Sequence, residues 1–236
     1  LGDHQIWNQY VAVLKHDFTI LRVDLPGHIK SGNVAETHTM DLMADCVSQA
    51  MDEIGMPSGH FVGHSMGGYV GMALAKSHPE RVESITLFNS TAREDNDQKK
   101  KDRIRTIRVF ELAPELFVNE AINNLFAEKH LESLAKEVAV LKNTALEVGL
   151  NGAAPALRGM AKREDMVDFL KNSTLPVLFV SGAFDNVIPI ESAKEQAEII
   201  GADIEIIEDS GHMCFVEAFD QTLHAMQNFW TKVLVS

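Results

Sequence analysis

The stretch Gly63-His64-Ser65-Met66-Gly67 decides the fold of this chain. It follows His60-Phe61-Val62, a short run that predicts a buried strand, and it precedes residues 68–75, whose small and apolar side chains predict a helix. A serine with glycines two positions before and after it, between a strand and a helix, is typical of a nucleophile elbow. Because the serine backbone is strained in such a turn, we expect both glycines to be needed: a Cβ there would make strand and helix collide.

The elbow also predicts how a reacting oxyanion would be held. The helix that begins at Met66 presents unpaired N–H groups and the positive end of its dipole to the space above the serine. The pattern G-x-S-x-G is short, however, and a tight strand-to-helix connection with a capping serine also matches it. The two interpretations are separated by whether an acid and a histidine follow in suitable places.

The composition describes a globular chain with a substantial core. The 236 residues are 45% hydrophobic and 23% charged, which fits one large domain or a core with an inserted subdomain. The formal net charge of −13, from 21 basic and 34 acidic residues, argues against a nucleic-acid partner. Cys46 and Cys214 lack metal-ligand spacing, and no apolar run is long enough to span a membrane. We therefore expect a cytoplasmic protein with a small-molecule partner, no membrane association and no metal, and we leave a homodimer open.

Strands and helices alternate along most of the sequence. Apolar spacing predicts helices over residues 4–14, 39–54, 68–77, 192–200 and 217–235, and apolar runs predict strands at residues 18–24, 60–62, 84–88, 176–182 and 203–207. Thr39 is the expected N-cap of the second helix. This alternation predicts an α/β fold with a doubly wound, mainly parallel sheet.

The alternation stops between residues 91 and 172. Apolar residues recur there at helical spacing with no strand among them, which predicts an all-helical insertion that caps the core. The core would then comprise residues 1–90 and 173–236, and we expect its first strands to be absent from this sequence. Small residues from Gly149 to Gly159 suggest a hinge within the insertion.

Three reactive side chains follow predicted strands: Ser65, Asp185 and His212. The carboxyl ends of parallel strands meet at one edge of a sheet, so loops after the strands are expected to bring these residues together. Asp24 and Asp209 are alternative acids, although Asp185 follows a strand at the expected place. His64 is interpreted as a pocket or packing residue because its side chain points away from that of the adjacent serine.

The chain resembles the α/β-hydrolase superfamily along essentially its whole length. Residues 63–68, 180–189 and 209–213 look like the family's nucleophile, acid and histidine segments, and residues 24–28 look like its Asp-x-x-Gly-His loop. The order serine, acid, histidine is that of the family. The resemblance implies the α/β-hydrolase fold, with the helical insertion in the position of the family's variable cap.

The resemblance also implies roles for individual residues. Ser65 would be the nucleophile, His212 the general base, and Asp185 the residue that orients the imidazole. The backbone N–H of Met66 would be one oxyanion donor, and Leu1 or a residue just before it would supply the second. Five residues in loops near these positions are candidate pocket walls: Phe88, Val187, Ile188, Met213 and Phe215.

These observations predict a serine hydrolase that cleaves a small, largely apolar ester through an acyl-enzyme, without a cofactor. The fold leaves open other reactions, namely enol-lactonase, C–C bond hydrolase, perhydrolase and menaquinone-synthase-like lyase chemistry. Arginines that face the pocket, from among Arg103, Arg105, Arg108 and Arg158, would favour an anionic substrate. The rival from another class is a hydrolase-like ligand-binding receptor with little turnover.

Overall fold

Four parallel strands form the sheet of this computed structural model, which describes residues 2–235. They are β1 (Gly59–His64), β2 (Val82–Phe88), β3 (Val177–Gly182) and β4 (Asp203–Ile207), and they lie side by side in chain order. In the ladders His64 pairs with Phe88, and Phe88 pairs with Val180. All four strands therefore end at one edge of the sheet.

Helices connect the strands, as the alternation predicts. They are η1 (His4–Trp7), α1 (Asn8–Leu14), α2 (Met40–Glu53), α3 (Met66–Ser77), η2 (Pro79–Arg81), α4 (Asp97–Leu112), α5 (Pro114–Asn123), η3 (Glu128–His130), α6 (Ala135–Ala161), α7 (Val167–Asn172), α8 (Ile190–Ile200), α9 (Cys214–Glu217) and α10 (Phe219–Val235). The Thr39 hydroxyl accepts a hydrogen bond from the Leu42 N–H, so the predicted N-cap is confirmed. No helix within residues 2–235 is long and apolar enough to cross a membrane.

Both faces of the sheet are covered, and strand β3 shows why. Its six residues are all buried. Val177 and Phe179 pack into a core with α2, α3 and α7, whereas Leu178 and Val180 pack into a second core with α1, α10 and the cap helices. A strand buried on both faces reads as a continuous apolar run, which is the pattern that the sequence shows.

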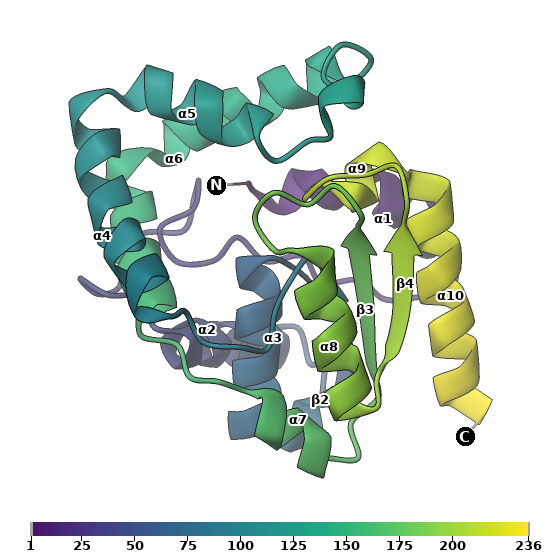
Figure 1. The fold of residues 1–236 in the computed structure, drawn as a ribbon. Helices are drawn as coiled ribbons and strands as arrows, with labels where there is room; N and C mark the ends of the chain where they lie inside the picture. The colour runs from purple at the N-terminus through teal and green to yellow at the C-terminus, as the bar shows by residue number, and fades with distance from the viewer. Residues whose placement is uncertain (1, 236) are drawn as a thin grey trace.

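Helices α4, α5 and α6 lie between β2 and β3 in the chain and pack on one another. Figure 1 shows them at the end of the sheet toward which the arrows of β3 and β4 point. Helix α7 instead packs against α8, and Figure 1 shows it at the opposite end of the sheet from α5. The cap therefore lies over the edge at which the strands end, while the boundaries 91 and 172 stay a prediction.

Three glycines in helix α6 determine how this helix bends and how closely it packs on the core. Gly149 interrupts the helix with φ 60° and ψ −171°, a conformation that favours glycine. Beyond it, a Cβ on Gly152 would overlap the Gly27 carbonyl oxygen, and one on Gly159 would overlap the His38 carbonyl oxygen. The second half of α6 is thus held tightly on the loop that follows residue 24.

The predicted strand at residues 18–24 is wrong for the described part of the chain. This segment forms no ladder with any strand of residues 2–235. It is separated from the edge strand β1 by part of a cavity that both segments line. The apolar pattern identifies an inward-facing segment, and Leu21, Val23 and Leu25 do pack on the core, but a strand also needs a hydrogen-bonded neighbour.

Candidate active site

Ser65 occupies a strained turn between β1 and α3. Its φ of 49° and ψ of −114° are unusual for a residue with a side chain. Three hydrogen bonds hold this backbone: the Ser65 N–H donates to the Phe88 carbonyl at 2.9 Å, and its carbonyl accepts from Gly68 N at 2.9 Å and from Ser90 Oγ at 2.8 Å. The turn is therefore an elbow, as the sequence predicts.

The glycines around the elbow differ in whether the structure requires a residue without a Cβ. A Cβ on Gly63 would lie 2.5 Å from the carbonyl carbon of Gly67, so the need for glycine before the serine is confirmed. A Cβ on Gly67 would meet nothing within 4 Å, so the matching expectation for the position after the serine is wrong within the described residues. The close approach comes one residue later, where a Cβ on Gly68 would overlap the Ser90 hydroxyl.

Asp185 and His212 form a buried pair. His212 Nδ1 lies 2.8 Å from Asp185 Oδ2, and the two residues are only 2% and 8% exposed. The other carboxylate oxygen, Oδ1, accepts hydrogen bonds from the N–H groups of Val187 at 2.7 Å and Ile188 at 2.9 Å. An ionised carboxylate only accepts, so Nδ1 carries the imidazole proton and Nε2 keeps its lone pair.

The surroundings of Asp185 keep it ionised. Burial alone would raise the pKa of its carboxyl group, but the hydrogen bond and charge of His212, with donors from Ile188 and Asn89, outweigh burial and lower the pKa. Elsewhere in the site, burial lowers the pKa of His64 to about 3, and the neighbouring His212 adds to this effect. Neutral His64 donates from Nε2 to the His212 carbonyl oxygen at 2.9 Å, so it supports the histidine loop by packing and hydrogen bonding.

The alternative acids lie elsewhere. Asp24 pairs with His4, whose Nδ1 lies 2.8 Å from its carboxylate. Asp209 is exposed and pairs with Lys129. Of the three acids considered from the sequence, only Asp185 contacts the His212 imidazole.

Asn89 belongs to the site, although the sequence analysis does not identify it. It directly follows β2 and is fully buried, and its Nδ2 donates to Asp185 Oδ2 at 2.9 Å and to the Gly211 carbonyl at 3.1 Å. One side chain thus ties the acid to the loop that carries His212. A signal was present, because Asn89 is a polar residue at the carboxyl end of a strand, where functional groups gather.

Glu217 is a second residue that the sequence analysis does not identify. Its side chain is fully buried, with Oε1 accepting from the Gly211 N–H and Oε2 accepting from the Ala127 N–H, both at 2.9 Å. His130 Nδ1 lies 3.2 Å from the same Oε2. Glu217 therefore connects the His212 loop to the segment of the cap that follows α5, and nothing in its helical sequence context signals this role.

Ser65, Met66 and His212 line one cavity of about 1080 Å³. Val187 and Met213 line it too, whereas Phe88 and Phe215 lie in the core beside Trp7, with the rings of Phe215 and Trp7 stacked at 4.7 Å. Ile188 is also buried and lies outside the lining. The volume includes the space between β1 and the segment 18–25, so only part of it lies over Ser65.

Ser65 and His212 thus line one cavity, and Asp185, which lies outside the lining, contacts His212. The chemistry of this predicted triad stays a prediction. The Ser65 hydroxyl makes no hydrogen bond to residues 2–235 and can turn toward a substrate. Leu1, the expected second oxyanion donor, lies outside the described residues. Within residues 2–235, no group of three His, Cys, Asp or Glu side chains is arranged to hold a metal ion.

Two relatives of this chain are acetyltransferase components of an acetoin cleaving system. The acetyltransferase component of the acetoin cleaving system of Cupriavidus necator is 30% identical over 227 residues, which are 92% of this chain and 57% of that protein. The component of the same name in Pseudomonas putida is 28% identical, and this chain covers 61% of it. The chain therefore spans about three fifths of the length of these two relatives.

Two hydrolases match over more of their own length. The 3-oxoadipate enol-lactonase 2 of Acinetobacter baylyi is 26% identical over 94% of this chain and 82% of that protein. A malate-bound thermophilic esterase from Thermogutta terrifontis is 27% identical, with a TM-score of 0.91 over 98% of this chain and 86% of that one. The model of the alpha/beta hydrolase fold family matches residues 1–219. The strained serine elbow, the parallel sheet and this match over nearly the whole sequence lead to one conclusion: the chain belongs to the alpha/beta hydrolase family.

Proposed function

We propose that this protein is a serine hydrolase that cleaves a small, largely apolar ester through an acyl-enzyme. The observation that carries the proposal is the buried 2.8 Å contact between His212 and Asp185, together with the cavity that His212 lines with Ser65. The enol-lactonase and the esterase among its relatives both act on ester bonds, which supports the choice of bond. The apolar side chains that the cap contributes to the cavity, among them Phe110 and Leu141, support the choice of substrate.

In the proposed reaction, His212 Nε2 removes the proton of the Ser65 hydroxyl as Oγ attacks the ester carbonyl carbon. The tetrahedral intermediate then expels the alcohol, which takes the proton from His212, and leaves an acyl group on Ser65. Water, deprotonated by His212, then attacks this acyl group, and the second tetrahedral intermediate releases the carboxylic acid as Ser65 Oγ takes the proton back from His212. Asp185 holds the imidazole in the required tautomer and stabilises its charged form.

The first residue of α3 supplies the proposed oxyanion donor. The Met66 N–H lies at the positive end of the helix, where backbone donors are not used within the helix. Removing one such donor typically lowers kcat by about a hundredfold to a thousandfold. The same machinery would open an enol-lactone, which is a cyclic ester, and the relative from Acinetobacter baylyi makes this the second candidate substrate class.

A fluorophosphonate probe tests the proposal directly. We expect one probe molecule per protein, attached to Ser65, and no adduct on a Ser65→Ala variant, as measured by intact mass and peptide mapping. A folded protein that takes up no probe would contradict the serine hydrolase proposal and favour the receptor alternative. The rates of hydrolysis of a panel of alkyl esters and enol-lactones then rank the substrate classes. Each rate is measured as the alkali needed to hold the pH constant while acid is released.

A further inference from the structure

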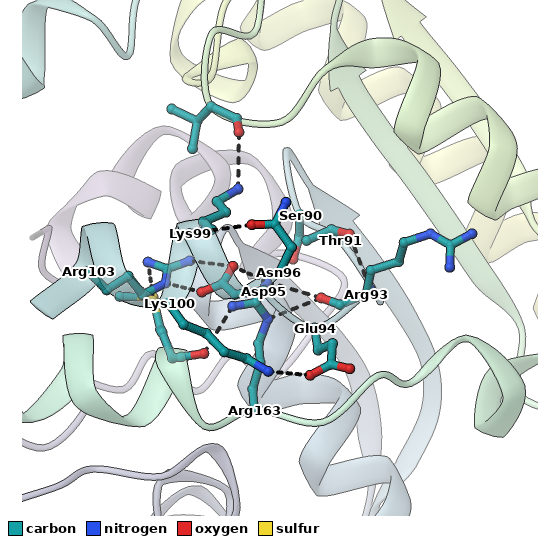
Figure 2. A network of polar contacts seen from close by, with 12 residues as sticks. Ser90, Thr91, Arg93, Glu94, Asp95, Asn96, Lys99, Lys100, Arg103 and Arg163 are labelled. Carbon is teal, nitrogen blue, oxygen red and sulfur yellow. Dashed lines mark hydrogen bonds and ion pairs between the residues drawn. The ribbon is translucent and has the colours of Figure 1, made fainter.

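A cluster of charged side chains lies at the base of the cap, beside the cavity. Figure 2 shows the Asp95 carboxylate between the side chains of Arg103 and Arg163. Asp95 is buried, with Oδ1 2.8 Å from Arg163 Nη2, and it also pairs with Arg103 Nε. One carboxylate is thus shared by two guanidinium groups.

The donors of Arg163 are taken up by the protein. Its Nε and Nη2 donate to the Arg93 carbonyl at 3.2 and 3.0 Å, and its Nη1 donates to the Met160 carbonyl at 3.0 Å. The guanidinium also lies 4.2 Å from the centre of the Tyr69 ring. Arg163 therefore has a structural role, namely to join the end of α6 to the segment that leads into α4.

Arg103 is placed differently, because it lines the cavity that contains Ser65 and His212. Besides the bonds to Asp95, its only hydrogen bond within residues 2–235 is from Nη1 to the Met160 sulfur at 3.3 Å, and a thioether is a weak acceptor. A guanidinium has five N–H donors, so Arg103 keeps donors for a ligand. Asp95 fixes the arginine without using up its capacity.

Lys99, one turn before Arg103 on α4, adds a second cation. Its Nζ lies 3.4 Å from the carbonyl oxygen of Val187, a residue of the cavity wall, and has no carboxylate partner within residues 2–235. In Figure 2 the Lys99 side chain points away from Asp95. Burial lowers the pKa of Lys99; among its neighbours, the charges of Asp95 and Asp185 raise this pKa, whereas those of Arg103 and Arg163 lower it.

The local charge is opposite to that of the whole molecule. Lys99, Arg103 and Arg163 carry three positive charges against the single negative charge of Asp95, whereas the chain has a formal net charge of −13. Two further acids nearby are occupied. Glu94 pairs with Lys100 outside the cluster, and Asp185 is held by His212, Asn89 and two backbone N–H groups. Arg163 is buried and Lys99 and Arg103 are half-buried, and an excess of positive charge on such side chains beside a cavity favours an anionic ligand group.

We propose that Arg103, assisted by Lys99, binds a carboxylate of the substrate at the cap side of the cavity. A guanidinium binds a carboxylate through two parallel N–H···O bonds, which fixes the orientation of the ligand. The remaining cap side chains that line this part of the cavity are mainly apolar: Phe110, Phe117, Ile122, Leu125, Leu141 and Met160. The substrate class is therefore an ester with an apolar chain that ends in a carboxylate, and this assignment rests on the proposed ester hydrolysis.

The test compares two ethyl esters with six-carbon acyl groups, the anionic monoethyl adipate and the neutral ethyl hexanoate. We expect Arg103→Gln to lower kcat/KM for monoethyl adipate by about tenfold to a hundredfold, mainly through KM, because a charge-assisted contact is lost. The rate with ethyl hexanoate should change less than about twofold. Lys99→Gln leaves the Asp95 contacts intact and should lower only the rate with monoethyl adipate, by about threefold to tenfold. Arg105→Gln, an exposed position on the same helix, is the matched control and should change neither rate.

Equal effects of Arg103→Gln and Lys99→Gln on both esters, or no effect on the anionic one, would overturn the assignment. Calorimetric titration with adipate separates this result from a failure of the proposed hydrolysis. If the wild type cleaves neither ester but binds adipate, and Arg103→Gln abolishes that binding, the carboxylate site stands and the hydrolase proposal falls. If the wild type cleaves ethyl hexanoate but neither prefers monoethyl adipate nor binds adipate, the carboxylate site falls and the hydrolase proposal stands.

Discussion

At the scale of single residues, Asn89 links the two halves of the proposed acid–base pair. Its φ of 44° lies in the left-handed region, which asparagine tolerates better than most residues that carry a side chain. The two hydrogen bonds from Nδ2 fix Asp185 Oδ2 and the Gly211 carbonyl relative to each other. Both the backbone and the side chain at this position therefore favour asparagine.

The variant Asn89→Gly separates these two requirements. Glycine keeps the positive φ without strain and removes only the side-chain hydrogen bonds. We expect kcat for an ester substrate to fall by about tenfold, because His212 and Asp185 lose a shared anchor, while KM stays within about twofold. Steady-state kinetics checks this, with Asn186→Gly, an exposed position on the acid loop, as control. An unchanged kcat would show that Asn89 serves folding alone.

The sequence predicts the positions of the motif residues better than it predicts which apolar side chains line the cavity. The motifs place Ser65, Asp185 and His212 in loops at one edge of a sheet; in the structure Ser65 and His212 line one cavity, and Asp185 contacts His212. Phe88 and Phe215 are predicted to line the pocket because they lie near the motif residues in the sequence, but both lie in the core. A loop position near a site does not determine whether an apolar side chain faces the cavity or the core, because that choice depends on packing partners such as Trp7.

At the scale of elements, Glu217 couples the cap to the loop that follows β4. Each of its carboxylate oxygens accepts one backbone N–H, from Gly211 beside His212 and from Ala127 in the cap. Burial raises the pKa of Glu217, so its ionised form depends on these donors and on the nearby His130. Movement of the cap at Ala127 would therefore reach the His212 loop through this side chain.

Replacing Glu217 with glutamine tests this coupling. The amide has one acceptor oxygen, and its NH₂ group would face one of the two backbone N–H donors. We expect Glu217→Gln to lower kcat by about tenfold and to lower the free energy of unfolding by about 1–3 kcal/mol, as measured by ester kinetics and chemical denaturation. Glu208→Gln, at an exposed position of the same loop, should change neither quantity. A loss of stability with unchanged kcat would contradict the proposed link to His212.

Element prediction from the sequence succeeded where the signal was local. Helix α2 begins after its predicted cap, Thr39, and all four strands of the sheet coincide with predicted apolar runs. The segment 18–24 has the same apolar character but no ladder partner among residues 2–235. Pairing is a property of two segments, so it cannot be read from one of them.

At the scale of the whole molecule, the ion pairs at the base of the cap connect distant parts of the chain. Asp95 precedes α4 and Arg163 follows α6, so their contact closes the insertion where it leaves and rejoins the core. Burial alone would raise the pKa of Asp95, but the hydrogen bonds and charges of Arg103 and Arg163 outweigh it and lower the pKa. Asp185 behaves in the same way beside His212.

These two buried carboxyl groups with lowered pKa values contribute to the response of the fold to acid. An unfolded aspartate has a pKa of about 3.9, so on acidification the unfolded chain takes up protons before the folded chain does. The stabilisation by both carboxylates is therefore fully present above about pH 4 and is lost as the pH falls through the lowered values. We expect the melting temperature to fall steeply below about pH 4.

The variant Asp95→Asn leaves the guanidinium groups of Arg103 and Arg163 with no carboxylate. It should lower the free energy of unfolding at pH 7 by about 3 kcal/mol, which corresponds to a melting temperature lower by about 6–12 °C. Because the variant lacks one of the two titrating groups, its melting temperature should also fall less steeply with acid. Scanning calorimetry of both proteins from pH 7 to pH 3 tests this, and parallel curves would show that Asp95 is not one of the groups whose protonation destabilises the fold.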